Sequence, residues 1–225
     1  MIGLKSIGGM LLCLSLASTK VFSSEVPIRY VALGDSYTIG TGASPQEAWP
    51  SVVTRRLQAQ GGSIELTDNL ARNGWTSQEV IQQELPALRQ LNPGLVTLMI
   101  GTNDWVHGIA NEVFEAHFSA ILDELLQIVR TPNRILIMTI PDFSVSPVGP
   151  QYANGRDIAK GLAAYNEIII RQAQQRQIQV VDLFALSQTM GKDATMFSPD
   201  GLHPSAKGYA KWADKIEGAL SNLLK

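Results

Sequence analysis

Five short runs of apolar, β-branched residues recur along the chain, separated by longer segments with helical periodicity. The runs cover residues 28–33, 63–66, 95–100, 134–140 and 178–183. Their length and composition predict strands. Strands that are apolar throughout and alternate with helices must be covered on both faces, which predicts a parallel sheet between two helical layers. We therefore expect an α/β fold, a doubly wound, flavodoxin-like three-layer sandwich with a five-stranded parallel sheet.

The intervening segments carry separate helix signals. Thr-Ser-Gln-Glu, starting at Thr76, has the pattern of a capping box and predicts a helix start. Further helices are expected over 156–175 and from Pro204, in the first turn, to Leu220. The stretch 142–155 is rich in Pro, Gly and Ser and predicts a loop over a site. One helix has apolar residues every three or four positions along one face, at Phe114, Phe118, Ile121, Leu122, Leu125 and Val129.

The first residues have the pattern of a secretory signal peptide. Lys5 is followed by an apolar run over 7–17 and then by small residues. That run is shorter than the roughly 20 apolar residues of a membrane anchor, and bulky Leu12 disfavours lipid attachment at Cys13. Cleavage after Ser23 fits the small residues there. We predict a signal peptide over 1–23, a single domain over 24–225, and a secreted or periplasmic protein.

Composition excludes several function classes. The chain has 18 basic and 20 acidic residues, 45% hydrophobic residues and no basic run, so nucleic acid is not an expected partner. The three histidines are far apart, and the one cysteine lies in the predicted leader, which argues against a metal site or a disulfide. No Walker or Gly-x-Gly-x-x-Gly element follows a strand, and no later segment is long enough for stable membrane insertion. We expect no cofactor.

Four polar blocks follow or flank the predicted strands. They are Gly-Asp-Ser-Tyr at 34–37, Arg-Asn-Gly-Trp-Thr-Ser at 72–77, Gly-Thr-Asn-Asp at 101–104 and Asp-Gly-Leu-His-Pro at 200–204. Ligands of doubly wound sheets bind beyond the carboxyl ends of the strands, where these blocks would converge. The sequence therefore predicts a site assembled from all four.

The residue types in these blocks suit nucleophilic catalysis. A serine hydroxyl needs a base, and an imidazole performs this role when a carboxylate fixes its tautomer. Ser36 and His203 supply the first two groups, and Asp200 lies three positions before His203. The backbone amides of Ser36 and Gly74 and the side-chain amide of Asn103 are candidate donors to an oxyanion.

The ordered set of blocks resembles the SGNH hydrolases, in the GDSL esterase and lipase family. The resemblance implies a carboxylic ester hydrolase with Ser36 as nucleophile, His203 as base, Asp200 orienting it, and Ser36, Gly74 and Asn103 as oxyanion donors. It implies no cofactor and a small-molecule ester or an acylated lipid or sugar as substrate. Tyr37 departs from the leucine of the family motif. The Gly-x-Ser-x-Gly elbow of α/β-hydrolases is not in the sequence.

Alternatives remain open at this point. The same triad serves acyl or acetyl transfer to an alcohol or sugar and carbohydrate deacetylation, and a noncatalytic binding module is a more remote reading. Trp75 and Trp105 are candidate substrate-binding residues, with core packing an equal contender. We expect Asp35 and Asp104 to support turns, and assign no role to His117. Oligomeric state is not readable from the sequence.

Overall fold

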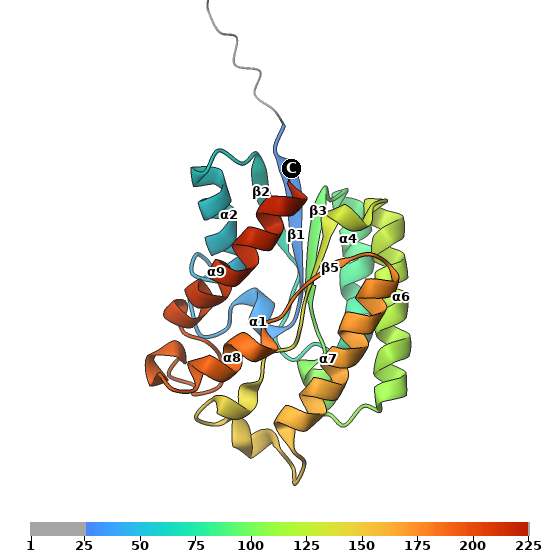
Figure 1. The fold of residues 1–225 in the computed structure, drawn as a ribbon. Helices are drawn as coiled ribbons and strands as arrows, with labels where there is room; N and C mark the ends of the chain where they lie inside the picture. Colours follow the sequence, from blue (N-terminus) through green and yellow to red (C-terminus); the bar gives the residue numbers. More distant parts are fainter. Residues whose placement is uncertain (1–25, 225) are drawn as a thin grey trace, which may run out of the picture.

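The computed structural model describes residues 26–224, so the predicted leader over 1–23 lies outside the described residues. Its sheet has five parallel strands in the order β2-β1-β3-β4-β5 (Figure 1). All five predicted strands are present, and the predicted fold class is confirmed. The strands are β1 (Ile28–Gly34), β2 (Ile64–Asn69), β3 (Leu95–Met99), β4 (Ile135–Met138) and β5 (Gln179–Val181).

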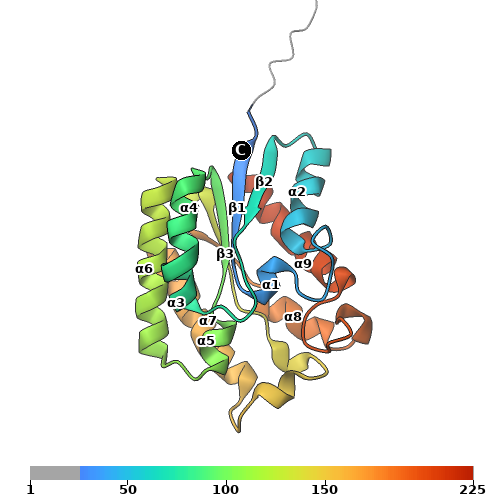
Figure 2. The same cartoon turned by 180° about the vertical axis from the view of Figure 1, so that it is seen from behind.

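Helices cover both faces of the sheet. Figures 1 and 2 show α2 and α9 on one side and α4, α6 and α7 on the other, with the sheet seen edge-on between them. This is the doubly wound, three-layer arrangement expected when buried parallel strands alternate with helices. The helices that cover the sheet are α2 (Trp49–Ala59), α4 (Leu85–Leu91), α6 (Asn111–Val129), α7 (Ile158–Gln175) and α9 (Ala206–Leu223).

The core lies between the sheet and these helices. Every residue of β3 and β4 is buried, and all of them except Thr97 are apolar, as burial on both faces of the sheet requires. The predicted apolar face of α6 packs inward, with five of its six residues buried and Val129 half-buried. Burial of these side chains supplies the main stabilisation of the fold.

The helix start predicted at Thr76 is confirmed, whereas the one predicted at Pro204 differs in the structure. Thr76 forms the predicted capping box with Glu79, whose carboxylate accepts the Thr76 N–H at 2.8 Å. The helix α3 (Ser77–Glu79) then continues as a π-helical turn, Val80–Glu84, which leads into α4. Pro204 does not lie in the first turn of α9, because Ser205 caps that helix and Pro204 pairs with Phe197 in an isolated bridge.

The carboxyl ends of the strands form one edge of the molecule, at the bottom of Figure 1. The strand order changes direction between β1 and β3, which is where doubly wound sheets bind ligands. Gly34 ends β1 with φ +143°, and a Cβ there would lie 2.2 Å from the Met99 carbonyl oxygen. Only glycine permits this close approach of the two strand ends.

Short elements surround this edge. The predicted loop over 142–155 contains two 3₁₀ turns, Phe143–Val145 and Gly149–Tyr152. The other short helices near it are α1 (Ser36–Ile39), α5 (Thr102–Val106) and α8 (Phe184–Met190). Within residues 26–224, the model has no helix with the length and apolar character needed to cross a membrane.

Candidate active site

Ser36 is the first residue of the short helix α1, directly after β1. Asp35 caps this helix, and its carboxylate accepts the Tyr37 N–H at 3.0 Å. The first amides of a helix have no intrahelical acceptor, so the Ser36 N–H is available to a ligand. Ser36 is only 9% exposed, and Gly40 ends α1 in the left-handed conformation. The sharp strand-to-helix turn thus presents the Ser36 side chain at the edge of the sheet.

Ser36, His203 and Asp200 form a continuous hydrogen-bonded chain. The His203 Nε2 lies 2.9 Å from the Ser36 Oγ, and the His203 Nδ1 lies 2.8 Å from the Asp200 Oδ2. A carboxylate only accepts hydrogen bonds, so Nδ1 carries the hydrogen and Nε2 is left to accept the serine proton. The structure thus brings together the three residues predicted as the triad, although Ser36 and His203 are 167 positions apart.

Asp200 is held as a carboxylate by its neighbours. Burial raises its pKa, but the hydrogen bonds donated by the Leu202 N–H, the Ser198 hydroxyl and His203 outweigh burial and lower the pKa of Asp200 to about 2. The turn 200–203 supplies two of these donors from its own backbone. The negative charge beside the His203 ring is therefore present at every physiological pH.

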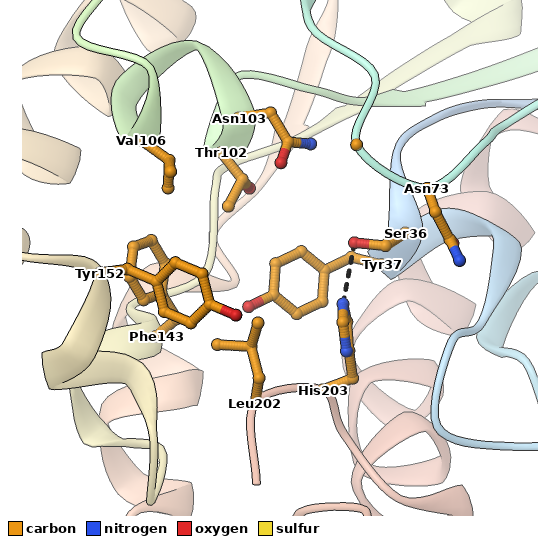
Figure 3. Close-up of a pocket in the computed structure, with 11 residues that line it drawn as sticks. Ser36, Tyr37, Asn73, Thr102, Asn103, Val106, Phe143, Tyr152, Leu202 and His203 are labelled. Atoms are coloured by element: carbon orange, nitrogen blue, oxygen red, sulfur yellow. Dashed lines mark hydrogen bonds between the residues drawn. The ribbon is translucent and has the colours of Figure 1, made fainter. Parts of the chain in front are cut away.

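A cavity of about 220 Å³ opens beside the Ser36 hydroxyl. Figure 3 shows that hydroxyl facing His203, with aromatic and aliphatic side chains filling the opposite wall. The wall is polar near Ser36 and apolar away from it, a division that suits a substrate with a polar reacting group on an apolar body. The cavity is lined by Ser36, Tyr37, Asn73, Gly74, Thr102, Asn103, Val106, Phe143, Tyr152, Leu202 and His203.

The predicted oxyanion donors lie on the polar side of this cavity. Gly74 has φ +79°, a backbone conformation that favours glycine. The Asn103 Nδ2 donates one hydrogen bond to the Trp75 carbonyl at 2.8 Å, which fixes the side-chain amide. An amide nitrogen carries two hydrogens, so a second donor remains. Ser36, Gly74 and Asn103 all line the cavity.

Tyr37 forms part of the wall next to the imidazole. Its ring lies 5.4 Å from the His203 ring and 5.6 Å from the Trp212 ring, tilted against both. The Tyr37 side chain is 3% exposed. The residue that departs from the family motif therefore supports the His203 ring and shapes the apolar side of the cavity.

The structure does not place the two predicted substrate-binding tryptophans in the cavity. Trp105 is 5% exposed and packs behind Phe143, with ring centroids 5.9 Å apart. The Arg156 guanidinium carbon lies 4.0 Å from the centroid of the Trp105 ring, so packing against these neighbours fixes the Trp105 side chain. Trp75 is half-buried, contacts Arg72, and contributes its backbone carbonyl to Asn103. Proximity to a motif in sequence was therefore a poor guide for both side chains.

Phe143 and Tyr152 replace the tryptophans as aromatic lining. Both lie in the predicted loop over 142–155, so the sequence indicated the segment, although no signal singled out these two side chains. Leu202 also lines the cavity and lies inside the last motif block. The position of Leu202 between Asp200 and His203 was the sequence signal that could have indicated its place in the cavity lining.

Two buried carboxylates lie close to Ser36 in the structure. Burial raises the pKa of Asp35 to about 7, partly offset by its hydrogen bond from Tyr37. Burial also raises the pKa of Glu84 well above its usual range, while the Gly34 N–H donates to its carboxylate at 2.9 Å. No pattern in the sequence indicated Glu84, because its inward position depends on the π-helical turn that ends there.

The remaining histidines lie outside the cavity lining. His107 is exposed, and the Nδ1 of His117 lies 2.9 Å from the Ser77 hydroxyl oxygen. Across residues 26–224, no three His, Cys, Asp or Glu side chains cluster in a way that could hold a metal ion.

The fold and the family comparison together define a carboxylic ester hydrolase. The chain belongs to the GDSL-like Lipase/Acylhydrolase family, whose sequence profile matches residues 32–211. That match spans all four motif blocks, and it confirms the resemblance that those blocks indicated.

Individual relatives agree with the family assignment. A multidomain esterase of Ruminococcus flavefaciens is 33% identical over 137 residues, covering 59% of this chain and 17% of that much longer protein. An arylesterase of Vibrio mimicus is 25% identical over 209 residues, covering 92% of both chains. The crystal structure of TesA superposes with a TM-score of 0.70 at 21% identity, covering 87% of this chain and 99% of that one, and shows the same fold.

Proposed function

We propose that this protein is a serine esterase that cleaves carboxylic esters through an acyl-enzyme on Ser36. The observation that carries the proposal is the chain of hydrogen bonds from Asp200 through His203 to Ser36, which ends at the cavity. Each link has the donor and acceptor order that general-base activation of a hydroxyl requires.

The proposed reaction has two acyl-transfer steps. The Ser36 Oγ attacks the ester carbonyl carbon while His203 Nε2 accepts its proton, and the imidazolium then protonates the leaving alcohol as the ester C–O bond breaks. Water, deprotonated by His203, next attacks the acyl-enzyme carbonyl and releases the carboxylic acid and free Ser36. Asp200 stabilises the imidazolium in both steps without itself accepting a proton.

The negative charge that develops on the carbonyl oxygen needs donors that are already in place. We assign this role to the backbone N–H groups of Ser36 and Gly74 and to the second hydrogen on Asn103 Nδ2. Preorganised donors of this kind stabilise a transition state more than a ground state, and one of them typically contributes about 10²- to 10³-fold in rate.

The size and the lining of the cavity favour a substrate with one short apolar or aromatic group. Its volume of about 220 Å³ lies below the range of about 300–1,000 Å³ typical of drug-sized ligand sites. Tyr37, Phe143 and Tyr152 supply ring faces for an aryl or short acyl group. A relative that is similar along nearly the whole chain is named an arylesterase, which agrees with an aryl group in the substrate.

Hydrolysis of p-nitrophenyl esters from acetate to palmitate, with Ser36→Ala in parallel, tests the proposal. We expect a rate that depends on Ser36 and is highest for the shortest acyl chains. A maximum at long chains would contradict the proposed substrate size. Activity that survives Ser36→Ala would contradict the acyl-enzyme, and absence of both hydrolysis and fluorophosphonate labelling would favour a noncatalytic binding module.

Transfer of the acyl group to an alcohol or sugar uses the same acyl-enzyme. Products are therefore analysed with and without an added alcohol or an acetylated sugar. We expect the free acid to dominate in both cases, because water reaches the open cavity. A dominant transesterified product would assign the protein to acyl transfer instead, and preferential deacetylation of the sugar would assign it to carbohydrate deacetylation.

A further inference from the structure

A second group of serine, aspartate and histidine side chains lies beside the oxyanion donors. The Ser77 hydroxyl donates to the Asp104 Oδ1, and the Ser77 N–H donates to the Asp104 Oδ2 at 2.9 Å. The His117 Nδ1 lies 2.9 Å from the Ser77 Oγ. Ser77 and Asp104 are 0% and 1% exposed and His117 is half-buried, and none of the three lines the cavity.

This buried group joins the two segments that carry the proposed donors. Asp104 follows Asn103 directly in α5, and Ser77 starts α3 three residues after Gly74. The Asn103 side chain also donates to the Trp75 carbonyl between them. Three hydrogen bonds therefore connect α5 to residues 75–77, and His117 on α6 adds a fourth link to the same hydroxyl.

The order of the groups excludes a nucleophilic role for Ser77. A carboxylate only accepts hydrogen bonds, so the Ser77 proton lies toward Asp104. The hydroxyl oxygen then accepts from the His117 Nδ1–H. The serine proton is held by a buried acceptor, and no free base faces it.

We propose that Ser77, Asp104 and His117 form a positioning network that fixes the distance between the oxyanion donors Gly74 and Asn103. This inference rests on the proposed function. Oxyanion donors act through geometry, and a displacement of a few tenths of an ångström weakens a hydrogen bond to a developing charge. The network thus affects the rate without touching substrate, and its members are positioning residues.

A double-mutant cycle between Ser77→Ala and Asn103→Ala tests the network. With p-nitrophenyl acetate, we expect Ser77→Ala to lower kcat about tenfold with KM changed less than twofold, because the effect is confined to the transition state. In the Asn103→Ala background the same substitution should change kcat by less than threefold, because the distance between the two donors no longer matters.

Thr97→Val is the matched control. The Thr97 hydroxyl is also fully buried and bonds the Tyr30 hydroxyl at 2.9 Å in the sheet core, away from the cavity. We expect this variant to lower the melting temperature comparably and to leave kcat unchanged. If Thr97→Val lowers kcat as much as Ser77→Ala does, the effect is general destabilisation and the positioning role is wrong.

Two further variants keep the test decisive. Ser77→Thr retains the hydroxyl and should restore most of the rate. If Ser77→Ala does not fold, Asp104→Asn goes through the same cycle, since it preserves side-chain size and replaces charged acceptors with a neutral amide. Losses that multiply with Asn103→Ala would overturn the network alone, whereas a wild type without Ser36-dependent hydrolysis would overturn the proposed function and the network with it.

Discussion

The two Ser, His and Asp groups of this molecule contain the same three residue types in a different order. In one, the His203 imidazole lies between the Asp200 carboxylate and the Ser36 hydroxyl. In the other, the Ser77 hydroxyl lies between Asp104 and the His117 imidazole. Only the first arrangement leaves a basic nitrogen facing the serine, so residue composition alone does not define a catalytic triad.

Exposure separates the two groups as clearly as order does. Ser36 lines the cavity, and the side chains of His203 and Asp200 are 15% and 41% exposed. Ser77 and Asp104 are fully buried. The charge on Asp200 is stabilised by donors from its own turn, whereas burial raises the pKa of Asp104 against the hydrogen bonds from Ser77. The first group can therefore take up a proton at an accessible site, whereas the second holds a fixed geometry in the interior.

The sharpest test of this difference is covalent labelling. We expect a fluorophosphonate to modify Ser36 and leave Ser77 unmodified, as read from the phosphonylated peptide by mass spectrometry. Ser36→Ala should abolish labelling and lower kcat by at least about 10⁴-fold, the scale on which loss of a triad nucleophile acts. Its melting temperature should stay within a few degrees of wild type. Phosphonylation of Ser77 would erase the distinction between the two groups.

Replacing each carboxylate by its amide compares the two acids directly. Asp200→Asn should lower kcat about 10³- to 10⁴-fold, because the asparagine can impose the wrong tautomer on His203 and cannot stabilise the imidazolium. Asp104→Asn should cost about tenfold or less, because the network would weaken while the triad stays intact. Steady-state kinetics on p-nitrophenyl acetate measures both. Equal losses for the two variants would show that Asp104 takes part in the chemistry.

The sequence predicted more of the first group than of the second. Ser36, Asp200 and His203 stand in short motif blocks, whose order and residue types carry chemical information. The strand runs likewise predicted all five strands, because a buried parallel strand must be apolar on both faces. The sheet edge on which the blocks converge followed from that topology.

The second group left only part of such a pattern, because Ser77 and Asp104 stand in the blocks 72–77 and 101–104 while no motif contains His117. His117 bonds Ser77 across 40 residues, and only the packing of α6 against α3 brings them together. The sequence left Trp105 open between substrate binding and core packing for the same reason, since its burial behind Phe143 depends on the path of the loop after β4. The inward turn of Glu84 depends on a π-helical segment. Contacts that arise from packing between distant elements are not encoded in local periodicity.

The pH dependence of stability should have opposite signs for the two acids. Hydrogen bonds, acting against burial, lower the pKa of Asp200 to about 2, below the unfolded value near 4. Its stabilising contribution is therefore present above about pH 4 and lost as the pH falls toward 2. Burial raises the pKa of Asp104, so its contribution is present below about pH 4 and lost as the pH rises through the folded-state pKa.

Thermal unfolding of wild type, Asp200→Asn and Asp104→Asn between pH 2 and 7 measures how the stability of each protein changes with pH. The stability difference between wild type and Asp200→Asn should shrink with acidification, and the difference for Asp104→Asn should shrink with rising pH. Parallel slopes would contradict the separation of the two environments.

Activity adds a second pH signal that belongs to the first group alone. An imidazole must be neutral to accept the serine proton, and histidine side chains ordinarily protonate between about pH 6 and 7. Because the Asp200 carboxylate stays ionised down to about pH 2, it should add no second proton to the acid side of the kcat/KM profile. Asp104→Asn should leave the midpoint of that profile in place. A rate that stays constant to about pH 4 would remove His203 as the base.

The smallest expected effect concerns His117, the outermost member of the second group. His117→Leu removes the donor to the Ser77 hydroxyl but leaves the bonds between Ser77 and Asp104. We expect kcat to fall about two- to threefold with KM unchanged, and His117→Gln, which keeps a donor, to stay closer to wild type. Stability should change by about 1 kcal/mol, the usual contribution of one hydrogen bond. A loss of kcat near that of Asp200→Asn would place His117 in the catalytic chain. A positioning residue that reaches the oxyanion donors only through Ser77 should affect kcat less than the residue that orients the His203 imidazole.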